Sequence, residues 1–116
     1  MKVVRLADAR PYVAPKHYDM RSLRLQGFEA SDAKAFWVGL SYFLPGGGAE
    51  RDSNPMEKVY VVVSGEVTLI TDSGEHTLTA LDSCHLAPGE ARAVENRTNS
   101  PATMLVLMTY PPEEPK

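Results

Sequence analysis

Many short apolar segments, separated by glycine and proline, run through this sequence and restrict what it can fold into. The clearest is Ala35–Leu44 (AFWVGLSYFL), which stops at the Pro-Gly-Gly-Gly of 45–48. Such breakers end a strand, and no segment shows the apolar period of a helix. The expected strands are Arg21–Gln26, Ala35–Leu44, Val59–Val63, Glu66–Thr71, His76–Ala80, Cys84–Ala87, Ala91–Glu95 and Thr103–Thr109. Many short strands at regular spacing predict an all-β sandwich or barrel.

The middle of the chain gives the most specific local signals. Val59–Val63 (VYVVV) is a continuous apolar run, typical of a strand buried on both faces. The two strands that follow alternate in polarity and flank Asp-Ser-Gly-Glu at 72–75, which predicts a hairpin.

Length and composition indicate one ordinary globular domain. The chain has 116 residues, of which 43% are hydrophobic and 23% are charged, values typical of a single globular unit. We expect an N-terminal arm with a short strand (1–34), a β-barrel (35–110) and a flexible C-terminal tail (111–116). No internal repeat or linker divides the chain further.

Charge, apolar runs and cysteine content restrict the expected partners and the expected cellular location. The formal net charge of −3 gives no reason to expect nucleic acid or a membrane surface, since either would favour a basic patch. No apolar run approaches the ~20 residues of a membrane span. The charged start also lacks the apolar stretch of ~7–15 residues that a signal peptide needs. A single cysteine, Cys84, cannot form an internal disulfide, so we expect a cytoplasmic protein.

Two residue patterns between Gly46 and Asn96 resemble the two motifs of the cupin family. The first family motif is G-x5-H-x-H-x3-E-x6-G, and its spacing is matched by Gly46, Asp52, Asn54, Lys58 and Gly65. The second is G-x5-P-x-G-x2-H-x3-N, and its spacing is matched by Leu81, Ala87, Gly89, Arg92 and Asn96. The resemblance implies a small jelly-roll barrel (a double-stranded β-helix) with a pocket inside.

The resemblance also implies where a metal would be held. In metal-binding cupins the two histidines and the glutamate of the first motif and the histidine of the second bind a divalent metal. Here those positions are Asp52, Asn54, Lys58 and Arg92. Lysine and arginine are normally cationic and arginine offers no lone pair, so they would repel a metal. We therefore expect neither a transition metal nor another cofactor. The alternative is a metal-dependent oxygenase with atypical ligands.

These substituted positions and their neighbours form the candidate site. Alternation places Lys58 and Tyr60 on one face of their strand, and the resemblance brings Arg92, Asp52 and Asn54 to the same pocket. The candidate catalytic residues are Lys58, Asp52 and Tyr60, and the candidate ligand-binding residues are Arg92, Asn54, Glu50 and Trp37. Structural roles stay open for several of them: a Lys58–Asp52 ion pair, a rim position for Arg92, and core packing for Tyr60 and Trp37.

A pocket with two cations, a carboxylate and an amide suits a small anionic ligand. Arg92 can hold a carboxylate or a phosphate with two hydrogen bonds, and Lys58 can exchange a proton if burial lowers its pKa. We hypothesise a metal-independent enzyme that moves a proton: an isomerase, an epimerase or a lyase. A non-catalytic protein that binds or senses a small acid would use the same residue types, so the two readings stay open.

The face of the Val59–Val63 strand that points away from the pocket predicts association with another subunit. Val59, Val61 and Val63 lie opposite the pocket, and either the N-terminal segment or a second subunit must cover them. The resemblance favours the second subunit, because small cupins commonly pair, often with exchanged N-terminal strands. We expect a homodimer.

Overall fold

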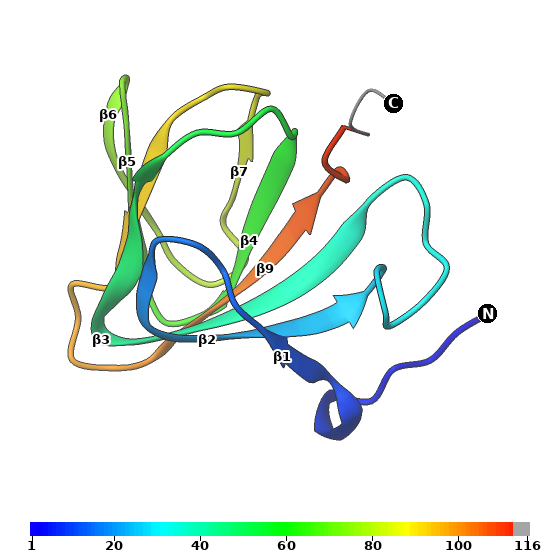
Figure 1. Cartoon of the computed structure of the whole chain (residues 1–116). Helices are drawn as coiled ribbons and strands as arrows, with labels where there is room; N and C mark the ends of the chain where they lie inside the picture. Colours follow the sequence, from blue (N-terminus) through cyan, green and yellow to red (C-terminus); the bar gives the residue numbers. More distant parts are fainter. Residues whose placement is uncertain (113–116) are drawn as a thin grey trace.

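Two antiparallel sheets face each other around one core (Figure 1), in a computed structural model that describes residues 1–112. The expected tail thus falls largely outside the described residues, since 113–116 are not among them. A 3₁₀ turn, η1 (Leu6–Asp8), precedes the strands β1 (Arg10–Tyr12), β2 (His17–Gln26), β3 (Trp37–Asp52), β4 (Lys58–Ser64), β5 (Val67–Thr71), β6 (Gly74–Leu78), β7 (Ser83–Leu86), β8 (Arg92–Glu95) and β9 (Ala102–Met108). None of the helical segments in residues 1–112 is long and apolar enough to cross a membrane.

The long strand β3 belongs to both sheets. Its first half pairs with β9, its second half pairs with β8, and β2 pairs along both halves. One sheet therefore runs β1-β2-β3-β9-β4-β7, and the other runs β3-β8-β5-β6. The expectation of an all-β jelly-roll barrel is confirmed.

The bend in β3 corrects one boundary drawn from the sequence. The strand expected to stop at Leu44 continues to Asp52 through the glycines. Gly46 has a φ of +83°, which turns the chain at this point, and a Cβ on Gly47 or Gly48 would clash with a backbone oxygen of the neighbouring strand. The glycines thus do not end the strand. They let it bend from one sheet into the other while adjacent backbones approach closely.

Asn96 holds this bend in place. The side chain is 1% exposed, and its Nδ2 donates to the carbonyl oxygens of Phe43 (3.1 Å) and Ser100 (2.9 Å). Its backbone exchanges two further hydrogen bonds of 2.9 Å with Gly46 and Gly47. This is the physical reason for an asparagine at the last position of the second motif.

The other strands follow the sequence closely. The predicted hairpin is β5–β6, in which Thr71 pairs with Gly74 across a two-residue turn. The strand expected at Arg21–Gln26 is longer, because β2 begins at His17. The core between the sheets contains Trp37, Phe43, Ala49, Tyr60, Val62, Val67, Leu69, Leu86, Val94, Ala102, Met104 and Val106.

Strand β4 confirms the predicted alternation and corrects the prediction that both of its faces are buried. Lys58, Tyr60 and Val62 point inward and are at most 2% exposed. On the outer face Val61 is only half-buried, and Val63 is 43% exposed. Among residues 1–112, the N-terminal segment therefore does not fully cover this outer face of β4.

Candidate functional site

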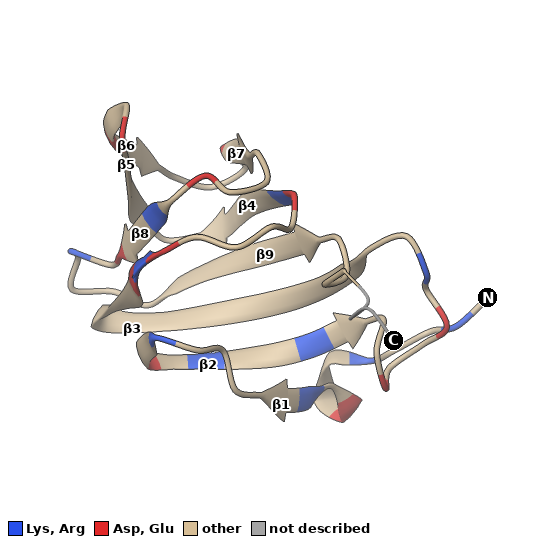
Figure 2. Ribbon diagram, turned by 45° about the horizontal axis from the view of Figure 1, so that its top comes forward, with Lys and Arg blue, Asp and Glu red and all other residues tan. Residues whose placement is uncertain are grey.

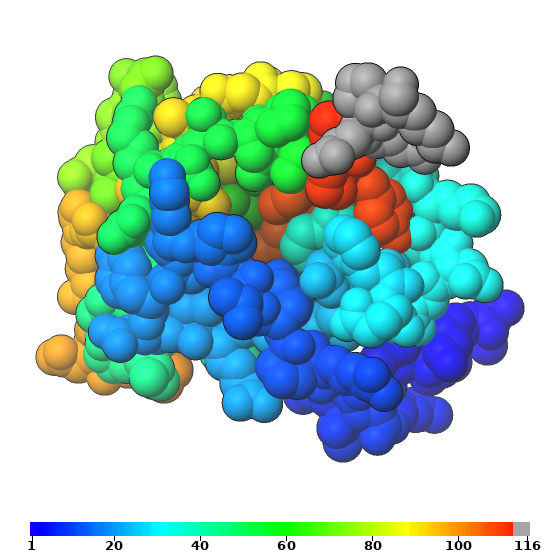
Figure 3. All heavy atoms as spheres, in the orientation of Figure 1, coloured from blue at the N-terminus to red at the C-terminus, as the bar shows by residue number. Residues whose placement is uncertain are grey.

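A cavity of about 370 Å³ lies between the two sheets. One wall consists of the inner faces of β3, β4, β8 and β9, and the opposite wall consists of residues 12–17 of the N-terminal segment. The space-filling view shows the hollow between this segment, drawn in blue, and the strands drawn in green and red (Figure 3). The volume lies within the range of sites for small molecules, roughly 300–1,000 Å³.

Most of the residues predicted for the site line this cavity. They are Trp37, Asp52, Asn54, Tyr60 and Arg92. Glu50 and Lys58 do not line it. The Glu50 side chain is exposed, and this residue reaches the site through its carbonyl oxygen, which accepts a hydrogen bond of 3.2 Å from Arg92 Nη1.

Arg92 lies inside the barrel and not at its rim. It is 7% exposed, and its backbone pairs with that of Asp52 across β8 and β3. Its Nε donates a hydrogen bond of 2.9 Å to the Tyr60 hydroxyl. Burial raises the pKa of Tyr60, although Arg92 opposes this shift. Because the Tyr60 oxygen accepts from Arg92, its own hydrogen stays available to donate.

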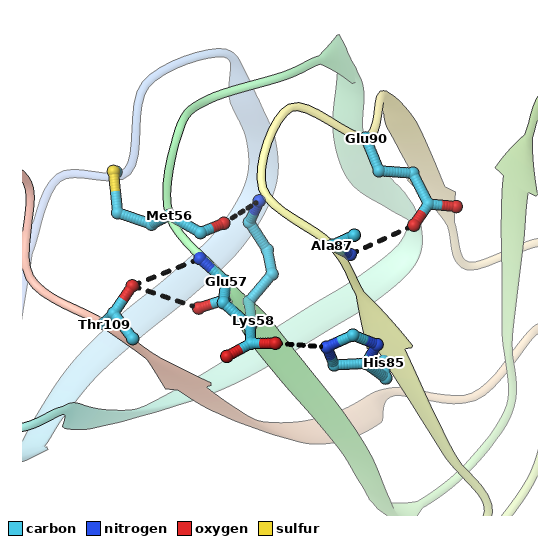
Figure 4. A network of polar contacts seen from close by, with 7 residues as sticks. All are labelled: Met56, Glu57, Lys58, His85, Ala87, Glu90 and Thr109. Atoms are coloured by element: carbon cyan, nitrogen blue, oxygen red, sulfur yellow. Dashed lines mark hydrogen bonds and ion pairs between the residues drawn. The ribbon is translucent and has the colours of Figure 1, made fainter.

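Lys58 is a buried ammonium whose partners belong to one loop. Its Nζ donates to Asn54 Oδ1 at 3.0 Å and to the Met56 carbonyl at 3.3 Å. Figure 4 shows the Met56 contact, and it also shows Glu57 of the same loop held by His85 at 2.7 Å. Burial, with Arg92 as the second cause, lowers the pKa of Lys58. The Lys58–Asp52 ion pair, one of the structural roles left open, is not formed, because the ammonium donates to Asn54 and Met56 instead.

Asp52 carries the one carboxylate among the described residues that line the cavity. A backbone hydrogen bond from Ser53 is the main cause that lowers the pKa of Asp52, and Lys16 contributes. The Lys16 ammonium lies 3.5 Å from Oδ1, and the Asp52 side chain is 38% exposed. Asp52 is therefore ionised at neutral pH and open to a ligand.

His17 enters the cavity on a tight turn of the N-terminal segment. The His17 N–H approaches the Ala14 carbonyl at 3.4 Å, with Pro15 and Lys16 at the central positions and a φ of 59° at Lys16. Nδ1 lies 2.7 Å from the Pro15 carbonyl. A carbonyl only accepts, so Nδ1 carries the proton and neutral His17 keeps a free lone pair on Nε2. Burial lowers the pKa of His17, Arg92 lowers it further, and Asp52 raises it.

Arg24 is a second cation in the cavity wall, contributed by β2. Its guanidinium carbon lies 4.0 Å from the ring centre of Tyr12, 4.2 Å from that of Phe28 and 4.6 Å from that of Trp37. Neither Arg24 nor His17 was among the residues predicted for the site. The cavity thus contains a carboxylate, a neutral imidazole, two phenols, two guanidinium groups and several other aromatic and methionine side chains.

A scan against protein families identifies the fold independently. The profile of the cupin domain matches residues 39–108. The chain belongs to the cupin family. The matched region begins inside β3 and ends with β9, so β1 and β2, which supply part of the cavity wall, precede it.

This cupin is similar along nearly its whole length to a bacterial protein. It shares 46% identity over 114 residues with a protein of Mycobacterium tuberculosis named Beta-D-galactosidase Rv1717, covering 98% of each chain. Two solved structures share the fold. A sugar phosphate isomerase from Silicibacter pomeroyi has a TM-score of 0.80 and 27% identity, over 97% of this chain and 77% of that one. The polyketide cyclase RemF from Streptomyces resistomycificus has a TM-score of 0.84 and 18% identity, over 94% and 79%.

Proposed function

We propose that this cupin hydrolyses β-galactosides in the cavity between its sheets. The observation that carries the proposal is the 46% identity, over 98% of both chains, to a protein named a β-D-galactosidase. The cavity supports it, because aromatic faces such as that of Trp37 and polar groups around them are the surroundings that a sugar ring requires. We therefore rank hydrolysis above the isomerase, epimerase or lyase reaction hypothesised from the sequence. Hydrolysis, like those reactions, depends on proton transfer.

Three side chains supply the chemistry of glycoside hydrolysis. The reaction passes through a positively charged sugar ring, which the ionised Asp52 carboxylate stabilises. Neutral His17 accepts a proton at Nε2 from the water that attacks the anomeric carbon. As the new C–O bond forms, the glycosidic C–O bond breaks, and the departing oxygen receives a hydrogen bond from Tyr60 and a proton from solvent. Arg92 orients Tyr60 through their hydrogen bond of 2.9 Å.

We propose that this reaction needs no metal, because the residues at the family's ligand positions do not fit one. The Lys58 and Arg92 side chains bring two cationic donors to positions that would have to supply lone pairs. Both are engaged as donors, Lys58 to Asn54 and Arg92 to Tyr60. Residues 1–112 also contain no group of three or more His, Cys, Asp or Glu side chains that could hold a metal. We therefore do not propose a metal-dependent oxygenase.

The test is hydrolysis of 4-nitrophenyl β-D-galactopyranoside by the whole chain, with the α-galactoside and the β-glucoside as specificity controls. We expect turnover of the β-galactoside. His17→Gln removes the base and should lower kcat about 10²–10⁴-fold, and Asp52→Asn should lower kcat about 10²–10³-fold. Asp72→Asn is the matched control, because Asp72 is a carboxylate on the surface with 84% of its side chain exposed. Its activity should equal that of the wild type.

The pH profile and a chelator test the assigned roles. Burial lowers the pKa of His17, so the neutral base persists into mildly acidic solution and the rate falls only as the pH drops through this lowered pKa. That acid limb should be absent in His17→Gln. Dialysis against EDTA should leave kcat unchanged. The proposal fails if folded protein does not cleave the β-galactoside, or if cleavage depends on an added divalent metal.

Isomerisation of an anionic sugar is the second candidate. It is favoured by the two arginines in the cavity wall, Arg24 and Arg92, and by the solved relative named a sugar phosphate isomerase. Incubation with hexose phosphates in D₂O would reveal it, because proton transfer at carbon incorporates deuterium that NMR detects. Binding without either reaction would leave the non-catalytic reading.

A further inference from the structure

Arg24 is held in a rigid cage of aromatic rings at one side of the cavity. The rings come from β1 (Tyr12), the loop after β2 (Phe28) and β3 (Trp37), and they also contact one another. The ring centres of Tyr12 and Trp37 are 5.7 Å apart and those of Phe28 and Trp37 are 5.6 Å apart, both in edge-on arrangements. Stacking against ring faces fixes a guanidinium group while leaving its N–H edges free to bind an acceptor.

The Arg24 guanidinium has donor capacity that the described residues do not use. Its Nε is buried and has no hydrogen-bond partner among residues 1–112. Glu29 Oε2 lies 3.8 Å from this nitrogen, which is beyond hydrogen-bond distance. A buried charged donor without an acceptor is costly, and such groups are commonly explained by an absent partner. Among residues 1–112, Glu29 thus gives Arg24 an ion pair but no hydrogen bond at Nε.

Arg24 borders the cavity that contains the proposed reaction site. Arg24, Asp52 and His17 line the same hollow. Glu29 lies instead on a separate hollow near the N-terminus, which Arg24 also borders. The carboxylate of Glu29 therefore faces Arg24 from the other side and does not fill the cavity. A ligand held against Asp52 and His17 would share the cavity with a cation that three aromatic rings hold in place.

We propose that Arg24 binds an anionic group of the substrate, a carboxylate or a phosphate, so that the preferred substrate is an acidic galactoside. This inference rests on the proposed function for the sugar and goes beyond it by naming the charge that the sugar carries. The guanidinium fork matches both kinds of oxyanion with two parallel hydrogen bonds. The proposal also moves the anion recognition that we predicted for Arg92 to Arg24. Arg92 already donates hydrogen bonds to the Tyr60 hydroxyl and the Glu50 carbonyl.

The test compares methyl β-D-galactopyranoside with two anionic counterparts, its 6-carboxylate (the uronoside) and its 6-phosphate. Trp37 is the one tryptophan of the chain and touches the Arg24 guanidinium, so its fluorescence reports occupancy directly, and calorimetry gives Kd. We expect wild-type protein to bind at least one anionic glycoside about 10–100-fold more tightly than the neutral one, as charged hydrogen bonds allow. Comparing the Kd values of the two anionic glycosides shows whether the site prefers a carboxylate or a phosphate.

Variants connect that preference to Arg24. Arg24→Met should abolish the preference for the anionic glycosides, and Arg24→Lys, which keeps the charge without the fork, should retain part of it. Glu29→Gln is the matched control and should keep the preference. Equal affinities in the wild type would overturn the proposal without any variant, as would a preference that survives in folded Arg24→Met.

A separate probe distinguishes failure of this inference from failure of the proposed function. Benzoate is a carboxylate that carries no sugar. If no glycoside binds, but benzoate quenches Trp37 in the wild type and not in Arg24→Met, the anion site stands and the galactoside is rejected. If the neutral and acidic glycosides bind equally, the anion site is rejected and the galactoside stands.

Discussion

At the scale of single residues, Leu81 adopts a backbone conformation that usually belongs to glycine. Its φ is 70° and it is 83% exposed, in a turn closed by a hydrogen bond of 2.9 Å from Asp82 N to the Thr79 carbonyl. The second cupin motif has a glycine at this position. Any side chain with a Cβ is strained in the left-handed region by roughly 1–2 kcal/mol, and the exposed leucine makes little contact that would offset this strain.

Leu81→Gly should therefore stabilise the protein. Relief of the strain exceeds the entropy that glycine loses on folding, which is roughly 0.5–1 kcal/mol, so the free energy of unfolding should rise by about 0.5–1 kcal/mol. Urea denaturation measures this change. Leu44→Gly is the matched control, because Leu44 is 54% exposed in strand β3 without a positive φ. It should lose stability, and a loss in both variants would contradict the strain at Leu81.

The same scale shows which site residues a sequence can reveal. Asp52, Tyr60 and Arg92 were predicted together from motif spacing and strand alternation, and all three line the cavity. Arg24 and His17 were not, because their positions depend on how the N-terminal segment pairs and turns. Nothing local signals that Lys16 adopts a φ of 59°, or that rings far apart in the sequence converge on one guanidinium. The roles of all these residues stay predictions.

At the scale of elements, the bent strand β3 connects the two sheets, and Asn96 fixes the bend. The hairpin β5–β6 was predictable because its turn sequence is local. The continuation of β3 through Pro45–Gly48 was not, since glycine and proline read as a strand end unless the neighbouring strands are known. Only the close approach of Gly47 and Gly48 to adjacent backbone oxygens explains why these glycines belong inside a strand.

Asn96→Ala should loosen this connection. It leaves the buried carbonyl of Phe43 without its hydrogen bond from Nδ2, and we expect a loss of about 2–3 kcal/mol in the free energy of unfolding. Gln26→Ala serves as the control, because its amide makes an exposed hydrogen bond of 3.4 Å to Lys2 and should contribute less than about 0.5 kcal/mol. Equal losses in urea denaturation would show that Asn96 does not fix the bend.

At the scale of the whole molecule, one sheet presents an apolar outer face. Strand β9 carries no charged residue, and β3 carries charges only near its end, as Figure 2 shows. The strand registers align two aliphatic rows across this sheet: Val61, Leu105, Leu40 and Leu23, and next to them Val59, Leu107 and Val38. Leu23 and Leu40 are each 7% exposed, whereas the other residues of the two rows are partly exposed. Partly exposed apolar faces can mark association sites, and we propose that a second copy of the chain covers this one.

The oligomeric state tests this proposal. Analytical ultracentrifugation should give a dimer at micromolar concentration, and Leu105→Lys should give a monomer, because it places a charge in the middle of the first row. Thr103→Lys changes the same strand and face beyond the aliphatic rows and should leave most of the dimer intact. Circular dichroism verifies that both variants are folded. A monomeric wild type would reject the outer face as a dimer interface.

The cavity wall formed by residues 12–17 precedes the region matched by the family profile. The barrel provides the carboxylate and the phenol, whereas this short peptide adds the imidazole and one ring of the cage around Arg24. A chimaera that exchanges only this peptide between cupins would keep its host's barrel and Arg24 and would exchange the imidazole at the cavity wall.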